Sequence, residues 1–438
     1  MINETTPIAL KHPPSAGTGG REEIRNPLRF FMWLTQTYGD IVQYRSSVEP
    51  AYLINHPDYI RHVLQTNGQN YNKDTFLNKY MLESLTGQGL LTSENPLWRE
   101  QRRLIQPAFH KQSLPKFVEL MRRAVARTVD RLSEAAAARQ PVNIAAEMMR
   151  LTLDIVTEAL FSFDITGQAE EIGEAMDTMT TIGKPRHRKV REAIDLLDRI
   201  VYAIIDERRA HPQRERDDLL NMLLDSRYDD GSPMPIKQVR DEVMALLVAG
   251  HETTANTLSW TWYLLDQYPE VVAQLEGEID AALAGGVPDV TDFHRLTYTE
   301  KVVQEAMRLY PSAWSISRRA LGDDEIGGYF IPAQSIVAMS PYTMHRHPAF
   351  WDEPDRFDPE RFAPEQVAAR PRFAYFPFGG GARQCIGNNF AMMESMIIIP
   401  AISGRFRLRR VSTEPVEGHA LVTLRPKGGI MIHVEPRG

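Results

Sequence analysis

The stretch "FGGGARQCIG", residues 378–387, contains the only cysteine of the 438-residue chain, Cys385. The glycines before it do not form a phosphate-binding loop, because a P-loop requires Gly-Lys-Ser/Thr and a dinucleotide fingerprint requires a glycine where Gln384 stands. Glycine also allows the backbone to pass close to a flat ligand, since it has no Cβ atom. We therefore expect this loop to lie against such a ligand.

The residues after Cys385, "IGNNFAMMESMIII", have helical periodicity, which places the sulfur just before the amino end of a helix. Backbone amides and the helix dipole favour a thiolate there, and a thiolate is a metal ligand. One cysteine cannot complete a structural zinc site, and no histidine has the usual zinc-ligand spacing from it. A haem iron needs only one such protein ligand. The alternative is a buried, inert cysteine.

The composition is that of a globular protein with a large core, with 43% hydrophobic and 24% charged residues. A net charge of -7 argues against a nucleic-acid-binding protein. A single cysteine excludes an intrachain disulfide, as is typical of the cytoplasm. Residues 1–20 contain no apolar stretch long enough for a signal peptide or membrane anchor, so we expect a flexible segment 1–20 and a single cytoplasmic domain over 21–438.

Helices are predicted for most of the middle of the chain. Segments 113–140 and 191–210 carry apolar residues three and four apart, and segment 241–269 is apolar on almost every side, as expected of a helix through the core. Strand-like alternation is confined to segments near the two ends, namely 39–46, 51–57, 406–411 and 428–436. The predicted fold is mainly α, in one large domain, with a small β region that draws on both termini.

The wider stretch "FPFGGGARQCIG" resembles the haem-binding signature of the cytochrome P450 monooxygenases, Phe-x-x-Gly-x-Arg-x-Cys-x-Gly. The matching residues are Phe378, Gly381, Arg383, Cys385 and Gly387. The resemblance covers most of the chain from about Tyr52 onward. It implies the cytochrome P450 fold and haem b, with Cys385 as the axial ligand of the iron.

Two further motifs follow the order of that family. In "EAMR", Glu305 and Arg308 are three residues apart on one helical face, where opposite charges can pair. Alone, they would be a solvated surface pair. In the family, this pair joins the arginine of a "PERF"-like segment, so the resemblance implies that Arg361 completes a buried structural triad.

The resemblance also implies partners for the haem propionates. Trp98 and Arg102, in "WREQRR", are similar to the tryptophan and arginine of the family's propionate-binding helix. Arg318 and His345 fall where similar sequences supply two more partners. Arginine suits this task because its donors match a carboxylate. The neighbouring Arg319 is an alternative, and the register favours Arg318.

The motif "AGHETT" in the long apolar helix resembles the family's oxygen-activation motif, with Glu252 as the acid and Thr253 as the alcohol. A charged residue in a core helix is costly unless it has a partner or a function. Ala249 and Gly250 precede Thr253 by one turn, so its hydroxyl can bond a carbonyl there and loosen the helix, which would open a groove for oxygen and water. Plain packing is the alternative. The resemblance implies that the haem lies between this helix and the Cys385 loop, and that one oxygen atom of O2 enters a substrate.

The electrons are expected from a separate ferredoxin or flavodoxin with its reductase, since no flavin or nicotinamide fingerprint follows the haem segment. Arg99, Arg103, Lys111 and Arg123 give the Trp98 region a positive character that suits an acidic partner. A merely solvated face is the alternative. We expect a monomer.

The substrate is expected to be a hydrophobic small molecule, because the segments that should line the distal pocket are largely apolar. The residues in question are Met244, Val248, Ala313, Trp314 and Ile316. A fatty acid or a terpenoid-like compound fits, and the layout of the motifs favours fatty acids. A peroxide-driven peroxygenase and a non-catalytic haem sensor or carrier are the rival functions, and Glu252 with Thr253 counts against the first.

Overall fold

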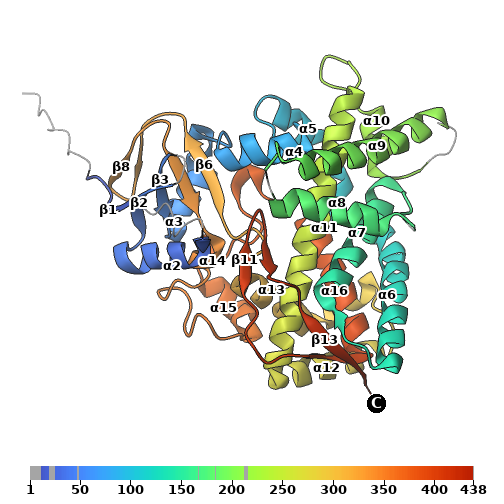
Figure 1. The fold of residues 1–438 in the computed structure, drawn as a ribbon. Helices are drawn as coiled ribbons and strands as arrows, with labels where there is room; N and C mark the ends of the chain where they lie inside the picture. The colour runs from blue at the N-terminus through green and yellow to red at the C-terminus, as the bar shows by residue number, and fades with distance from the viewer. Residues whose placement is uncertain are drawn as a thin grey trace, which may run out of the picture. The chain divides into compact units, whose positions relative to one another are not determined.

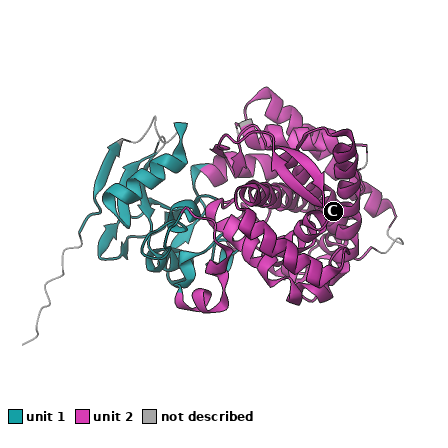
Figure 2. Cartoon of the chain, turned by 90° about the horizontal axis from the view of Figure 1, so that it is seen from below, with its two compact units in different colours: residues 1–76, 314–354, 370–384 teal, residues 77–313, 355–369, 385–438 magenta. Residues whose placement is uncertain are grey.

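The computed structural model describes residues 11–18, 25–46, 49–165, 167–182, 184–211 and 216–437. Within it the chain forms two compact units, each assembled from separate segments (Figure 2). Unit 1 comprises residues 1–76, 314–354 and 370–384, and unit 2 comprises residues 77–313, 355–369 and 385–438.

Unit 1 is built on a six-stranded sheet with the order β1-β2-β3-β9-β6-β4. Strands β2 and β3 form an antiparallel hairpin, and β3 pairs in parallel with β9, with Ala51 opposite Ile336. Helix α2 begins where the side chain of Asn26 accepts a hydrogen bond from the Arg29 amide. Its buried face, including Phe31 and Leu34, packs on the β2–β3–β9 part of the sheet.

The elements of unit 1 have the following bounds: β1 (Ser15–Thr18), α2 (Pro27–Tyr38), β2 (Ile41–Arg45), β3 (Pro50–Ile54), α3 (Pro57–Arg61), η1 (His62–Thr66), η2 (Gly68–Asn70), β4 (Tyr71–Asn72), β6 (Ile316–Ala320), β7 (Asp324–Ile326), β8 (Tyr329–Ile331), β9 (Ile336–Met339), α14 (Pro341–Met344), η8 (Arg372–Ala374) and η9 (Gly381–Arg383).

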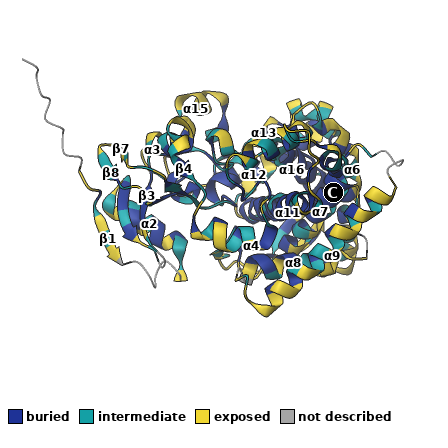
Figure 3. Ribbon diagram, turned by 90° about the horizontal axis from the view of Figure 1, so that it is seen from above, coloured by how far each residue is buried: buried dark blue, intermediate teal, exposed yellow. Residues whose placement is uncertain are grey.

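The helices of unit 2 range in length from four to 32 residues. They are α4 (Glu83–Thr86), α5 (Leu97–Ile105), α6 (Val118–Ala138), α7 (Ile144–Phe161), α8 (Ala169–Ile182), α9 (Arg188–Ala210), α10 (Leu219–Asp225), α11 (Ile236–Gln267), α12 (Pro269–Leu283), α13 (Thr297–Leu309), α15 (Pro364–Ala369) and α16 (Asn388–Ser403) (Figure 1). Helix α11 has 32 residues and packs closely on α7. Figure 3 shows α7, α11 and α16 largely in the dark blue of buried residues, as their apolar sequences require.

Two small sheets and some short helical turns complete unit 2. The strands are β5 (Val142–Asn143), β10 (Phe406–Arg410), β11 (Gly418–Ala420), β12 (Leu424–Pro426) and β13 (Met431–Pro436). The turns are η4 (Gln106–Phe109), η5 (Leu114–Phe117), η6 (Val290–Arg295) and η7 (Pro359–Phe362), and a π-helical segment, η3 (Phe76–Leu82), begins at the last residue of unit 1. One sheet has the order β10-β13-β5, and β11 and β12 form a separate hairpin.

The predicted fold class, mainly α with small sheets, is confirmed. The predicted helices correspond to α6, α9 and α11, and the four predicted strands correspond to β2, β3, β10 and β13. The idea of one β region drawing on both termini is wrong, because the early strands pair with β9 and β6, while β10 and β13 belong to a different sheet that includes β5. Periodicity identifies a strand but not its partner.

The amino-terminal expectation needs correction as well. Within the predicted flexible segment, Ser15–Thr18 forms β1 and pairs in parallel with β2, while residues 1–10 and 19–20 lie outside the described residues. In the described part of the chain, no helix combines the length and the apolar character needed to cross a membrane.

Candidate active site

Cys385 opens the last segment of unit 2, three residues before α16 begins at Asn388. The residue is exposed to water, yet protein surrounds its sulfur. Burial therefore raises the pKa of the thiol, and this outweighs the hydrogen bond from the Gly387 amide and the charge of Arg102, which both lower it.

The glycines before Cys385 are required by contacts inside unit 1. Gly381 has φ +68, and a Cβ atom there would lie 1.7 Å from the Leu64 carbonyl oxygen of η1. A Cβ atom on Gly380 would lie 2.3 Å from the Phe373 ring. We expected these glycines to let the backbone approach a ligand, but packing against the protein itself explains them. A Cβ atom on Gly387, beyond the cysteine, would meet nothing within 4 Å, so packing against the protein does not explain that glycine.

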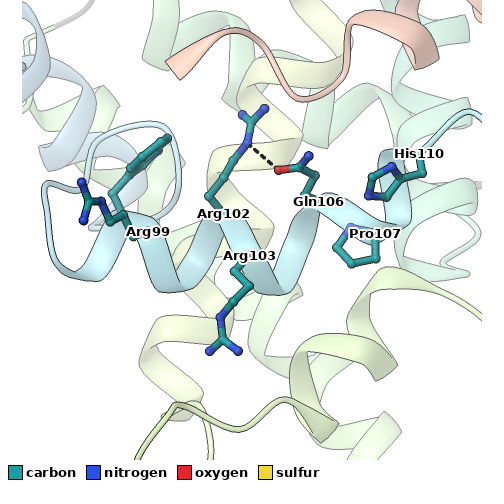
Figure 4. A pocket seen from close by; sticks show the side chains of 7 residues that line it. Arg99, Arg102, Arg103, Gln106, Pro107 and His110 are labelled. Carbon is teal, nitrogen blue, oxygen red and sulfur yellow. Dashed lines mark hydrogen bonds between the residues drawn. The ribbon is translucent and has the colours of Figure 1, made fainter. Parts of the chain in front are cut away.

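The first predicted propionate partners, Trp98 and Arg102, lie one turn apart on α5. Arg102 acts electrostatically on Cys385, and burial lowers the pKa of its guanidinium while Cys385 raises it. An open pocket of about 380 Å³ lies alongside this helix (Figure 4). Its lining consists of Trp98, Arg99, Arg102, Arg103, Gln106, Pro107 and His110. In Figure 4, Arg102 and Arg103 point to opposite sides of the helix. Arg102 points toward Gln106, and its Nε donates a hydrogen bond to the Gln106 side chain at 3.4 Å.

The predicted partners in unit 1 are Arg318 and His345. Arg319 donates to the carbonyl oxygens of Asp74 and Gln334 and to the carboxylate of Glu49, so its guanidinium is already engaged in unit 1. That engagement agrees with the choice of Arg318, which is buried on β6.

His345 is fully buried at the end of α14, and its Nε2 accepts a hydrogen bond from the Phe376 amide at 3.0 Å. A neutral imidazole with Nε2 as acceptor carries its proton on Nδ1, so Nδ1–H is the donor that this histidine can offer.

On α11, the residues from Val239 to Leu265 are buried except for Ala249, Gly250 and Thr253. These three lie at positions i, i+1 and i+4, on one face of the helix. The hydroxyl of Thr253 donates to the Ala249 carbonyl at 2.7 Å. The helix remains continuous through this turn, so the expected loosening is absent. The only accessible face along the buried part of this helix therefore coincides with the predicted oxygen-activation motif.

Glu252 does not suit the predicted role of acid. Its Oε1 accepts hydrogen bonds from Arg425 Nε at 2.8 Å and from the Thr423 hydroxyl. Burial raises the pKa of this carboxyl, but Arg425 and Thr423 together hold the pKa below its ordinary value. An ionised, hydrogen-bonded carboxylate holds no proton to donate, and we correct that assignment.

The structure brings the three residues of the predicted triad together. Arg308 Nε and Nη2 donate to the two carboxylate oxygens of Glu305 at 2.6 and 2.8 Å, and both side chains are 0% exposed. Arg361, in η7, reaches within 3.5 Å of Glu305. Burial raises the pKa of the Glu305 carboxyl, and the Arg308 donors act in the opposite direction. The bidentate pair joins α13 to the η7 segment, since Glu305 also accepts from the Asp358 amide.

The predicted pocket residues are not all free to contact a substrate. Met244 and Val248 are buried within α11, and Ala313 follows α13. Trp314 packs its ring against Phe31, with centroids 5.8 Å apart, and Ile316 packs on the apolar core of unit 1. The expectation that Trp314 lines a pocket is corrected to a core contact.

The sequence reasoning missed two charged residues beside this part of α11. Arg425 of β12 pairs with Glu252, and Glu394 of α16 is buried against Thr254. A signal for Glu394 was available, because it is a charged residue in an apolar helix, as Glu252 is. Arg425 carries no such signal.

The residues around Cys385 fit a haem group. Cys385 is exposed and offers one thiol sulfur, and the guanidinium of Arg102 acts on it electrostatically. A haem iron needs only one such protein ligand, because the porphyrin supplies four of its bonds.

A family model described as cytochrome P450 matches residues 19–433. The chain belongs to the cytochrome P450 family. Cyclooctatin synthase of Streptomyces melanosporofaciens is 36% identical over 94% of this chain and 92% of its own length. Pentalenene oxygenase of Streptomyces avermitilis is 31% identical over 92% and 91%. The solved heme domain of cytochrome P450DA has a TM-score of 0.89 at 27% identity, covering 98% of both chains.

As a cytochrome P450, the protein is an oxidoreductase that incorporates oxygen and has haem b as its cofactor. The family match runs through both compact units, so the two units belong to one family domain.

Proposed function

We propose that this cytochrome P450 is a haem-thiolate monooxygenase that oxidises a hydrophobic terpenoid-like substrate, and that Cys385 would hold the haem iron. The observation that carries the proposal is the accessible face of Ala249, Gly250 and Thr253 on an otherwise buried helix, in the same unit as an accessible Cys385. Bound at Cys385, the haem supplies the activation of O2 and the insertion of one oxygen atom.

The surrounding residues have distinct proposed roles. Trp98 and Arg102 would donate to a haem propionate, and Arg318 and His345 stay predicted propionate partners. Phe378, Arg383 and Gly387 would enclose the thiolate, and the Gly387 amide would keep a hydrogen bond to the sulfur. Ala249 and Gly250 would offer a face without bulky side chains to the opposite side of the ring. Arginine and a neutral Nδ1–H imidazole both suit a carboxylate acceptor.

Thr253 would hold water for proton delivery. Its hydroxyl hydrogen is used by the Ala249 carbonyl, so the oxygen atom is oriented as an acceptor for a water molecule. Because Glu252 is held ionised by Arg425, we assign proton delivery to Thr253 and water without the neighbouring acid.

The substrate class is proposed from the relatives together with the apolar lining. Cyclooctatin synthase, pentalenene oxygenase and cyclooctat-9-en-7-ol 5-monooxygenase are terpenoid-oxidising relatives. Their likeness favours a terpenoid over the fatty acid that the sequence layout favoured. The proposed electron donor is a separate ferredoxin or flavodoxin with its reductase, and the proposed compartment is the cytoplasm.

The test is Thr253→Ala, assayed with limonene as the first probe, after a blue shift of the Soret band has established its binding. We expect unchanged haem content and limonene affinity, because alanine fits a helix well. Product per reductant should fall severalfold and hydrogen peroxide should rise, since a positioned proton-transfer group contributes about 100-fold or more to its step.

Thr261→Ala is the matched control. Thr261 lies on the same helix and donates to the carbonyl four residues back at 2.8 Å, but on a fully buried turn. Equal product ratios in the two variants would mean that Thr253 only packs.

A further inference from the structure

The hairpin of β11 and β12 is anchored along one stripe of α11. Thr423 donates to Glu252 and accepts from Asn256 Nδ2 at 3.1 Å. Trp260 Nε1 donates to the Leu424 carbonyl at 3.1 Å. The three residues of α11 are four apart, so they form one row along three successive turns. The row begins next to Thr253.

Arg425, in the same hairpin, connects that row to α8. Its Nε donates to Glu252, as described above, and its Nη1 donates to Asp177 Oδ1 at 2.5 Å and to Thr181 Oγ1 at 2.8 Å. Its Nη2 donates to the Thr180 hydroxyl. The α8 acceptors lie on one face of that helix, three and four residues apart. A single guanidinium thus joins β12 to α11 and α8 within unit 2.

The two ends of this connection differ in burial. Glu252 is 2% exposed, so removal of Arg425 would leave a buried carboxylate without its counterion. Asp177 is 67% exposed, so water can replace Arg425 there at little cost. The bond from Arg425 to Asp177 of α8 can therefore break while the bond from Arg425 to Glu252 of α11 remains.

We propose that Arg425 is a positioning residue that latches α8 and the β11–β12 hairpin to the Glu252–Thr253 turn of α11. This inference rests on the proposed function of Thr253, and it assigns to Glu252 the role of anchor. The fork geometry is essential, because only a guanidinium can donate to Glu252, Asp177 and the two threonines at once.

The test uses the haem-loaded protein and two readouts. Hydrogen exchange of residues 169–182 is followed by mass spectrometry in the resting state, without turnover. Arg425→Gln should increase exchange of α8 by at least about tenfold, because it removes the bonds to Asp177, Thr180 and Thr181 together. Asp177→Asn should increase exchange by a smaller factor, because the bonds from Arg425 to the two threonines remain. With a ferredoxin, its reductase and limonene, only Arg425→Gln should also raise peroxide per reductant severalfold, because Asp177→Asn leaves the Glu252 pair intact.

Two variants separate a latch from general stabilisation. Arg410→Gln breaks a comparable bond, in which Arg410 Nε of β10 donates to Asp266 of α11 at 2.7 Å, and it should leave α8 exchange unchanged. Arg425→Lys keeps the charge and should restore the peroxide ratio through Glu252, but not the protection of α8.

The proposal is overturned if α8 exchange in Asp177→Asn and Arg425→Gln equals that of the wild type, or if lysine restores both readouts. Asp177→Asn is a surface change and keeps the test decisive should Arg425→Gln fold poorly. Because exchange is measured without catalysis, a wrong role for Thr253 would alter the peroxide readout alone.

Discussion

At the scale of single residues, Glu394 is the most unusual side chain in the core. It is 1% exposed on α16, and its Oε1 has no hydrogen-bond partner among the described residues. Burial raises the pKa of this carboxyl well above its ordinary value of 4.5, although a hydrogen bond with Thr254 acts the other way. Glu394 is therefore protonated over a pH range in which an exposed glutamate is ionised.

The linkage between this pKa and folding gives a prediction for Glu394→Gln. A raised folded-state pKa contributes stability that is fully present below the ordinary value and is lost as the pH rises through the folded-state pKa. Above pH 4.5 the unfolded chain releases the proton and the folded chain keeps it, so wild-type stability falls by up to about 1.4 kcal/mol per pH unit from this group. Glu394→Gln removes that slope.

Urea unfolding of both proteins at a series of pH values measures this effect, with the exposed Glu365→Gln as control. We expect the difference in unfolding free energy between Glu394→Gln and wild type to grow with pH. Parallel stability curves would mean that Glu394 has a partner in solution.

Single residues also show which parts of the site can be predicted from the sequence. Cys385 and Thr253 stand out because their motifs are local, with all members within a few residues. The pairing of Glu252 with Arg425 joins residues 173 positions apart, and nothing around either one indicates the other. The sequence thus predicts a carboxylate in the site, but the chemistry of that carboxylate depends on a distant partner.

At the scale of elements, the contact between α13 and η7 contains two ion pairs of very different character. Arg308 and Glu305 are fully buried, while Lys301 reaches Glu360 at 2.9 Å with side chains that are 20% and 50% exposed. Lys301 joins α13 directly to Glu360 of η7, whereas Arg308 and Glu305 both lie on α13, and Glu305 reaches the η7 segment through the Asp358 amide and Arg361. They form a matched comparison of buried and exposed charge.

We predict that Arg308→Ala lowers the free energy of unfolding by about 3 to 5 kcal/mol, because it strands Glu305 without its counterion. Lys301→Ala should cost at most about 1 kcal/mol. Soluble yield, haem content and melting temperature measure both effects. Similar melting temperatures for the two variants would contradict a structural role for the buried pair.

Elements were predictable where a single periodicity runs for several turns, as in α6, α9 and α11. Strands β6 and β9 were missed, although β9 is the central partner of β3. It spans only four residues, Ile336–Met339, all buried. Such a short apolar run has no alternation to detect, since both of its faces are covered.

At the scale of the whole molecule, a protein of net charge -7 carries a cluster of arginines around α5. Nearby carboxylates offset part of this positive charge. Arg103 lies 2.6 Å from Asp229, and Arg123 lies 3.0 Å from Glu158. Among the described residues no ion pair of Arg99 is recorded. The positive character expected from the sequence is therefore weaker than the count of basic residues indicates, and Arg99 and the exposed Lys111 are the members with no ion pair among the described residues.

We predict that reduction of the haem protein by an acidic ferredoxin slows as salt is raised, because exposed charges are screened within about 10 Å at 0.1 M ionic strength. Arg99→Glu should slow it at low salt more than Arg103→Glu does. Stopped-flow reduction under carbon monoxide measures the rate, with exposed Lys189→Glu of α9 as the control reversal. If the reduction rate depends neither on the salt concentration nor on the Arg99→Glu change, α5 is not part of the docking surface.

The parallel pairing of β3 with β9 has a consequence for synthesis on the ribosome. Asn55, just after β3, bonds Thr343, which follows it by 288 residues. At about 5 to 20 residues per second, the ribosome needs roughly 15 to 60 s to supply that partner, whereas a hairpin forms in about 1 to 10 μs. Throughout that interval the nascent chain presents β3 as an open strand edge, which is a template for pairing with other chains. Chaperones that bind extended apolar segments should therefore act on this protein before its second half is made.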